Sequence, residues 1–188
     1  FIGPLDPMSH VDRLVTWLGG LEEPLQLVIA GEGPERVKLE ALTHRLPTSH
    51  RIHFVGTSED HPKGGMSPTP LGWSSGLHGL FALADLVVTA SDDEFPYWLL
   101  EAAAAGVPAV AVRNAGTEAV VAHHQSGFLT PPTKAGFVRA IRHLLYRPAL
   151  RHRFAAAATT KAAEHSIEKS VNKLLDVYAL VRRTHSSF

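Results

Sequence analysis

The sequence contains no cysteine. Disulfide bonds, thiol nucleophiles and the commonest zinc sites are therefore excluded, and this composition fits a cytoplasmic location. The sequence also lacks net charge, because 18 lysine and arginine residues offset 18 aspartate and glutamate residues. Without a net charge the chain has no long-range attraction for nucleic acid or an anionic membrane surface, so we expect no nucleic-acid partner.

Long apolar runs are missing as well. None approaches the roughly twenty residues that a membrane-spanning helix needs, so the sequence reads as that of a soluble protein. It begins at Phe1, inside an apolar stretch, without an initiator methionine or a charged leader. We therefore expect the chain to be part of a longer protein. Its 188 residues are enough for one well-buried domain.

Short apolar runs alternate with helix-period segments along most of the chain. This alternation is typical of parallel strands joined by crossover helices, and it predicts an α/β fold. We expect a Rossmann-like, mainly parallel sheet of about six strands, with helices on both faces and a helical C-terminal extension. The clearest strand candidates are residues 25–30, 52–55, 86–89, 109–112 and 127–130.

Helix ends are marked by serine and proline. Ser9 is expected to cap the first helix, Pro34 to occupy the first position of the second, and Ser166 to cap the last. That last helix carries an apolar face made of Val171, Leu174, Leu175 and Tyr178.

Residues 57–76 interrupt the pattern with glycine, proline and serine, in a connection longer than the roughly two to six residues usual after a strand. The segment is either a disordered surface loop or a lid that contacts a ligand or partner. Trp73 favours the second alternative, a loop that contacts a ligand or partner.

Ligands of an open parallel sheet bind beyond the carboxyl ends of its strands. The candidate loops are therefore residues 3–9, 31–34, 56–76, 90–97 and 113–117. Within 90–101 (ASDDEFPYWLLE), three acidic residues precede a helix start that can hold a phosphate, although Asp92 or Asp93 can equally be a simple helix cap. Glu101 is either a buried carboxylate that needs hydrogen-bond donors or part of an exposed helix face.

Several motifs together resemble one family. LVIAGEGPERVKLEAL, RIHFVG, LFALADLVVTAS, DEFPYWLLEAAAAGVPAVA, NAGTEAVV and SGFLTPP follow in its order and spacing. The chain is similar throughout to the C-terminal domain of retaining glycosyltransferases of family 4, which have the two-domain GT-B fold. The resemblance implies a donor-binding domain at 1–165 with the insertion 57–76, and a C-terminal crossover helix at 166–188. It also implies an N-terminal acceptor domain that is absent from this chain.

The family's pair of acids, separated by seven residues, falls on Asp93 and Glu101. In the family the second acid binds the ribose hydroxyls of a nucleotide-diphosphate-sugar, while the first acid and nearby loop amides hold the transferred sugar and the diphosphate. Asp93 is thus the implied catalytic residue. The implied donor-binding residues are Gly3, Gly31, Val55, Gly56, Asp93, Glu94, Phe95, Tyr97, Trp98, Leu99 and Glu101.

The resemblance implies no metal and no cofactor beyond the donor itself, since such enzymes stabilise the leaving phosphate with protein cations and helix dipoles. The acceptor then attacks on the face from which the phosphate departs. The implied partners are a nucleotide sugar, the chain's own N-terminal domain and, through that domain, a lipid acceptor or peripheral membrane contact. A homodimer is a further expectation.

The sequence departs from the family where the diphosphate would bind. Pro4 and Ser9 stand where the family has arginine and lysine, and Lys63, His10 or Arg113 are the substitutes that we consider. In addition, Pro96 replaces a glycine and lacks its N–H group, and Asp93 is one methylene shorter than the usual glutamate.

These departures keep a second function open, namely a catalytically weakened homologue that acts as a binding or regulatory partner. A sugar-nucleotide epimerase on the same fold ranks lower, because no acid-base pair for the sugar ring can be named. The 12 histidines do not favour a metal site, since the adjacent His123 and His124 point apart in either regular structure and residues 121–128 are expected to form a surface turn.

Overall fold

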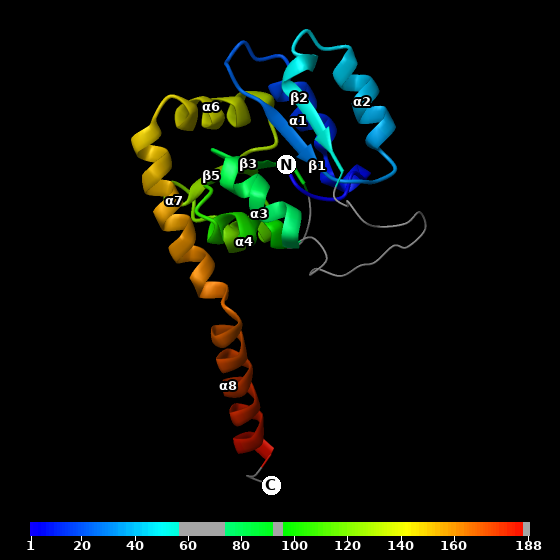
Figure 1. Cartoon of the computed structure of the whole chain (residues 1–188). Helices are drawn as coiled ribbons and strands as arrows, with labels where there is room; N and C mark the ends of the chain where they lie inside the picture. The colour runs from blue at the N-terminus through cyan, green and yellow to red at the C-terminus, as the bar shows by residue number, and fades with distance from the viewer. Residues whose placement is uncertain (57–73, 92–95, 186–188) are drawn as a thin grey trace.

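The computed structural model describes residues 1–56, 74–91 and 96–185 as helices alternating with parallel strands (Figure 1). Most of the expected insertion 57–76, including Lys63 and Trp73, lies outside the described residues. Residues 92–95 of the acidic segment lie outside them too.

The first half of the chain forms a small parallel sheet. Strands β1 (Leu27–Ala30) and β2 (Ile52–Val55) pair with Leu27 opposite Ile52 and Ala30 opposite Val55. Helix α1 (Val11–Leu18) precedes β1 and buries an apolar face of four residues, and α2 (Arg36–His44) connects the two strands. The two helices pack against each other.

The second half forms a three-stranded parallel sheet in the order β3 (Val87–Thr89), β4 (Ala109–Val112) and β5 (Gly127–Thr130). Every residue of these strands is buried, as expected for a parallel sheet covered on both faces. Helix α3 (Ser74–Leu83) precedes β3, while α4 (Tyr97–Ala104) and α5 (Ala115–Val120) connect the strands.

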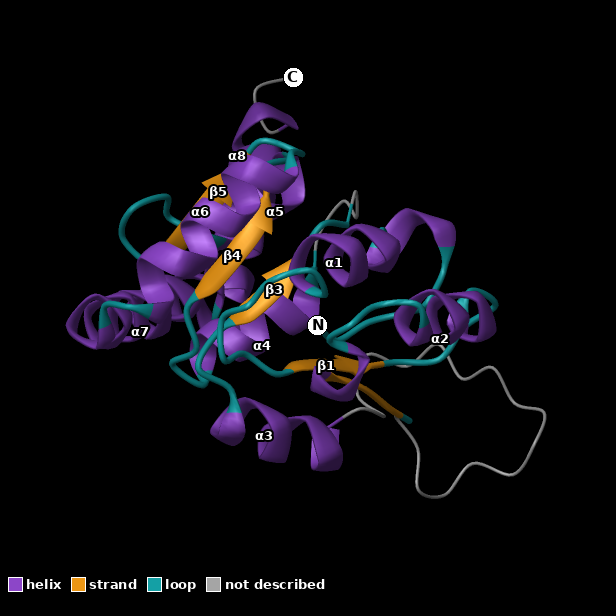
Figure 2. Cartoon of the chain, turned by 90° about the horizontal axis from the view of Figure 1, so that it is seen from above, coloured by secondary structure: helices purple, strands orange, loops and turns teal. Residues whose placement is uncertain are grey.

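The expectation of about six strands in one sheet is wrong for the described residues, which form five strands in two sheets. Residues 1–3 run parallel to β1, but they form only an isolated bridge between Ile2 and Ala30. Beyond Gly3 the chain continues beside the loop after β1, where Leu5 donates to the carbonyl of Glu32. The N-terminal residues lie between β1 and β3 in both views (Figures 1 and 2).

Helices cover opposite faces of the second sheet. In Figure 1, β3 and β5 lie between α6 (Lys134–Leu145) above and α4 below. Helix α6 contacts β4 and β5, and it also packs on α1, where the Trp17 and Phe137 rings lie 5.3 Å apart. One continuous hydrophobic core therefore joins the two sheets.

Two helix starts differ from the sequence expectation. Ser9 lies in the 3-10 turn Pro7–Ser9, and the residue that precedes α1 is His10, in a left-handed conformation with φ of 48°. Helix α2 starts at Arg36 rather than at Pro34. The reason for the first difference is local, because Asp6 accepts the Ser9 amide and turns the chain before α1 begins.

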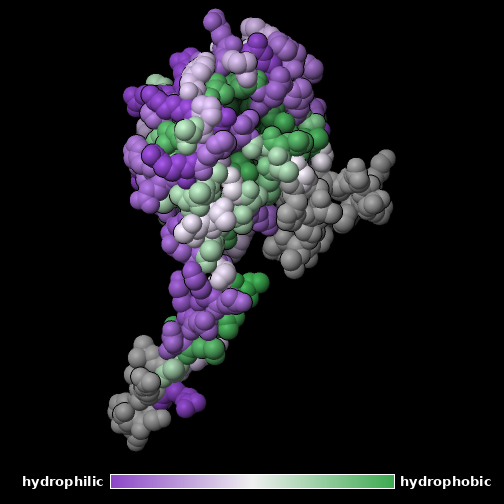
Figure 3. Space-filling model, turned by 60° about the vertical axis from the view of Figure 1, so that its left-hand side comes forward, coloured by the Kyte–Doolittle hydropathy of each residue, from purple (hydrophilic) through white to green (hydrophobic). Residues whose placement is uncertain are grey.

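The C-terminal part is helical, with α7 (Pro148–Ala162) followed by α8 (Ile167–His185). The Ser166 hydroxyl accepts the Lys169 amide at 3.3 Å, which confirms the predicted cap. Helix α8 extends away from the rest of the chain (Figure 1), and its apolar residues follow one side of it (Figure 3). Those exposed side chains are Ile167, Val171, Leu174, Leu175, Val177, Tyr178 and Val181. None of the helices in the described ranges is long and apolar enough to span a membrane.

An ion pair between Glu23 and Arg142 ties the segment before β1 to α6, across 119 residues of sequence. The Glu23 side chain is only 9% exposed, whereas that of Arg142 is 52% exposed. The hydrogen bond from Arg142 lowers the pKa of Glu23 below its ordinary value, against the opposing effect of burial. The folded state is therefore stabilised by the ionised carboxylate.

We expect Glu23→Gln to lower the melting temperature at pH 7, because Arg142 loses its charged partner. A carboxyl group whose pKa is depressed on folding contributes stability above its unfolded pKa of 4.5, and this contribution is lost as the pH falls through the lower folded value. The difference between the variant and the wild type should therefore shrink below about pH 4.5 in thermal melts followed by circular dichroism. The neighbouring exposed Glu22→Gln is the control, and an equal loss in both variants would contradict the role of the pair.

Candidate functional site

The loops that follow the first strands are joined by backbone hydrogen bonds. The Gly3 amide donates to the Ala30 carbonyl at 3.0 Å, and the Gly31 amide donates to the Val55 carbonyl at 3.1 Å. Leu5 donates to Glu32, and Glu35 donates back to Leu5, each at 2.9 Å. The predicted site residues Gly3, Gly31 and Val55 are therefore brought together at one edge of the sheet.

This contact is possible only without side chains. A Cβ atom on Gly31 would lie 2.0 Å from the Gly3 carbonyl oxygen, and one on Gly33 would lie 2.3 Å from the Leu5 carbonyl oxygen. Backbone atoms on both sides leave no flexible group that could move away. Glycine is required here by close approach of two main chains.

Arg36 holds the same turn from the side of α2. Its guanidinium donates to the Gly31 carbonyl at 3.2 Å and forms ion pairs with Glu32 and Glu40. Because two carboxylates already neutralise it, Arg36 stabilises the turn rather than adding positive charge to the site.

The richest candidate segment, 90–101, is described in part. Ala90 and Ser91 follow β3 and are buried, and α4 starts at Tyr97. The predicted residues Asp93, Glu94 and Phe95 lie outside the described residues. Pro96 precedes α4 and offers no capping side chain to its first amides. Such amides and the helix dipole favour an anion.

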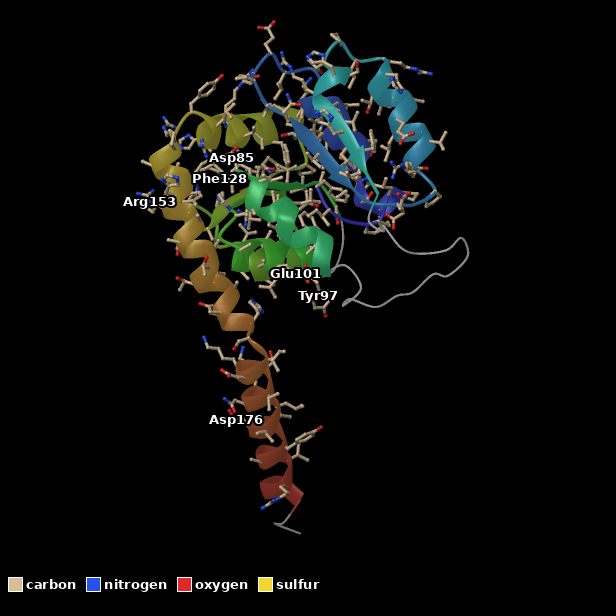
Figure 4. All side chains as sticks on the ribbon, in the orientation of Figure 1. Asp85, Tyr97, Glu101, Phe128, Arg153 and Asp176 are labelled. Atoms are coloured by element: carbon tan, nitrogen blue, oxygen red, sulfur yellow. The ribbon has the colours of Figure 1, made fainter. Side chains whose placement is uncertain are left out.

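The predicted site residues on α4 point in two directions, some toward the outside of the molecule and others into the core. Tyr97 is 65% exposed and Glu101, four residues later, is exposed on the same side of the helix (Figure 4). Of the two alternatives for Glu101, the exposed face is the one that the structure has. Its role as a ribose ligand stays a prediction.

Trp98 and Leu99 point into the core instead. Trp98 is 9% exposed and packs edge-on against Phe1, with ring centroids 5.6 Å apart, and Leu99 is 1% exposed. The side chains of these two residues are therefore not available to a ligand. Gly56 is exposed next to Val55 at the end of β2.

The candidate loop 113–117 contains a residue, Asn114, that the prediction of site residues did not include. Asn114 caps α5 in a reciprocal arrangement with Thr117, and its side-chain amide donates to the Ser91 carbonyl at 2.7 Å. Asn114 therefore joins the loop after β4 to the loop after β3. The signal that could have revealed it is the spacing of Asn114 and Thr117, which is typical of a capping box.

Pro4 and Ser9, the two positions where the resemblance in sequence implies arginine and lysine, carry no charge. Pro4 is exposed, and Ser9 is 1% exposed with its hydroxyl donating to the Asp6 carbonyl at 2.7 Å. The Ser9 side chain is thus used within its own turn.

The adjacent histidines lie at the turn expected within residues 121–128, so they are not in a regular helix or strand, in which their side chains would point apart. The rings of His123 and His124 lie 3.9 Å apart, because His124 has a left-handed φ of 65° and the pair lies in a turn rather than in regular structure. His123 accepts the Leu129 amide at 3.0 Å, and burial, followed by the neighbouring His124 and Arg113, lowers the pKa of His123. Among the residues that the structure describes, no three histidine, aspartate or glutamate side chains gather as a metal site.

A cavity of about 420 Å³ lies at the other end of the strands. Its lining is mostly apolar and includes residues before β1, residues before β3 and the end of α3. It lies mainly toward the amino ends of the strands, and its lining extends along β1 as far as Ala30. Ligands of parallel sheets bind at the carboxyl ends.

Comparison with known proteins now decides the family. Residues 1–147 match the model of the family described as glycosyl transferases group 1. The chain belongs to this family. Its strand ends and the start of α4 are thus those of a glycosyltransferase domain.

Individual relatives agree with this result. The chain is 26% identical over 181 residues to the lipopolysaccharide core biosynthesis glycosyltransferase LpsD of Rhizobium meliloti, covering 95% of this chain and 45% of that protein. It is 29% identical over 185 residues to a GDP-mannose-dependent alpha-mannosyltransferase of Mycobacterium tuberculosis, covering 97% and 42%. The chain thus spans less than half the length of these relatives.

Solved structures share the fold. The structure of HepE from Anabaena in complex with UDP superposes with a TM-score of 0.73 at 22% identity, covering all of this chain and 48% of that one. This likeness confirms the α/β, Rossmann-like arrangement of parallel strands and helices.

We expect Gly31→Ala to destabilise the fold by about 1–3 kcal/mol, the usual range for overpacking, because the new methyl group meets the Gly3 carbonyl. Chemical denaturation followed by tryptophan fluorescence measures the difference. Gly79→Ala in α3 is the matched control, since no described atom lies within 4 Å of its added Cβ. That variant should be neutral or slightly stabilised, as alanine favours helices. Equal stability of the two variants would show that the close approach at Gly31 is not required.

Proposed function

We propose that this chain binds the nucleotide-diphosphate-sugar donor of a retaining glycosyltransferase of family 4, as the C-terminal half of a two-domain enzyme. The observation that carries the proposal is the start of α4. Helix α4 begins after the β3 loop, where its dipole favours an anion, and it presents Tyr97 and Glu101 on one exposed face. Membership of the glycosyl transferases group 1 family and the UDP complex of HepE, a protein of the same fold, support it.

In the proposed site, two kinds of protein group bind different parts of the donor. Glu101 is an acceptor-only carboxylate, so it suits two neighbouring ribose hydroxyls. The first amides of α4 suit the diphosphate, whose charge grows as the sugar leaves. Asp93 holds the transferred sugar in this proposal, and the acceptor attacks on the face from which the diphosphate departs. No metal takes part.

The acceptor is proposed to come from a part of the protein outside this chain. The relatives are more than twice as long as the matched segment, and α8 exposes an apolar face that a second domain would cover. Holding two reactants in place is worth about 7–11 kcal/mol of a reaction barrier, which this chain alone cannot supply.

We expect Glu101→Ala to weaken binding of UDP or GDP roughly 10- to 100-fold, since a lost hydrogen bond to a charged group costs about 1.5–3 kcal/mol. Isothermal titration calorimetry of the purified chain measures this. The control is Glu22→Ala, an exposed carboxylate before β1, which should bind as the wild type does. If Glu101→Ala binds as tightly as the control, the ribose contact is wrong.

The isolated chain should transfer no sugar to simple sugar or lipid acceptors. The physical reason is that donor binding alone leaves the acceptor unpositioned. Radiolabelled donors measure the transfer, and slow donor hydrolysis by water would be compatible with the proposal. Acceptor-dependent turnover by this chain alone, at the rate of a full-length relative, would overturn the assignment of a half-enzyme.

A further inference from the structure

A donor diphosphate carries negative charge that the site must balance, and the two positions where the family has cations hold Pro4 and Ser9. We propose that Arg113 binds the diphosphate in their place. This inference rests on the proposed donor-binding function, and it assigns the charge to a loop different from the one that the family uses.

The strand register places Arg113 at the right edge of the sheet. Thr89 of β3 lies opposite Ala111 of β4, so two further residues bring Ser91 opposite Arg113. The hydrogen bond from Asn114 to the Ser91 carbonyl, at 2.7 Å, confirms that the two loops remain side by side beyond the strands. Arg113 thus follows β4 beside the loop that leads into α4.

No other described lysine or arginine side chain is as well placed to balance the charge of the diphosphate. The described residues of the carboxyl-edge loops are 3–9, 31–35, 56, 90–91, 96–97, 113–117 and 131–133, and Arg113 is the single lysine or arginine among them. Arg36 lies next to the second loop, but Glu32 and Glu40 already neutralise it. The first amides of α4 supply partial positive charge, which a guanidinium nearby would complement.

The present partner of Arg113 is weakly held. Its guanidinium pairs with Glu118, and the two side chains are 46% and 50% exposed. Exposed ion pairs of this kind contribute little stability. A diphosphate offers several charged oxygens to the planar guanidinium, so it can replace the single carboxylate. Glu118 therefore competes with the ligand for Arg113.

The experiment compares variants of both partners by calorimetric titration with UDP and GDP. Arg113→Ala should weaken binding of the nucleotide that the wild type prefers roughly 10- to 100-fold, and Arg113→Lys should lose less because one charge remains. Glu118→Gln should bind more tightly than the wild type, since the competing charge is gone, and an unchanged affinity would contradict this competition. Arg139→Ala on α6, an exposed arginine away from these loops, is the control and should bind unchanged.

The outcomes separate the two proposals. If the wild type binds neither UDP nor GDP, the proposed function fails. If it binds and Arg113→Ala binds equally well, only the assignment of Arg113 fails. A loss of similar size in Glu118→Gln and Arg113→Ala would show that the pair matters for the structure of the loop, and it would overturn the inference as well. Melting curves of each variant identify any that do not fold. If the Arg113 variants do not fold, the affinity of Glu118→Gln decides whether the assignment of Arg113 stands.

Discussion

Two main-chain segments of this domain touch where no side chain fits. Gly31 lies against the carbonyl group of Gly3, and Gly33 lies against that of Leu5. A Cβ atom on either glycine would clash with the carbonyl oxygen opposite it. This contact allows Leu5 and Glu32 to hydrogen-bond, and it lets the Gly31 amide reach the end of β2. The loops after the first strands therefore form one rigid group, and the edge at which a donor would bind depends on it.

The packing of α4 controls the second part of that edge. Trp98 and Leu99 anchor the helix in the core, and the contact of Trp98 with Phe1 links it to the first residues of the chain. Because residues four apart share a helix face, burial of these two leaves Tyr97 and Glu101 outside. The packing of Trp98 and Leu99, which anchors α4 in the core, thus also orients the candidate binding residues Tyr97 and Glu101.

Much of the architecture follows from local pattern. Strands 52–55, 109–112 and 127–130 have the predicted bounds, since short apolar runs between turn residues leave little choice. The motif around residues 93–101 indicated a glycosyltransferase, and the match to the glycosyl transferases group 1 family confirms this coarser assignment. The start of α1 and the contact between the His123 and His124 rings were not predictable, because both depend on single left-handed residues that periodicity does not reveal.

The sequence by itself determined the alternation of strands and helices, the family and the loops that carry the candidate site. Those features depend on residue type and spacing along the chain. Only the tertiary structure decided that Glu101 is exposed, that residues 1–3 form a single bridge, and that Asn114 joins two loops. The physical reason is that exposure and long-range hydrogen bonds depend on which neighbour packs beside a residue, and that neighbour is brought close only by the folded chain.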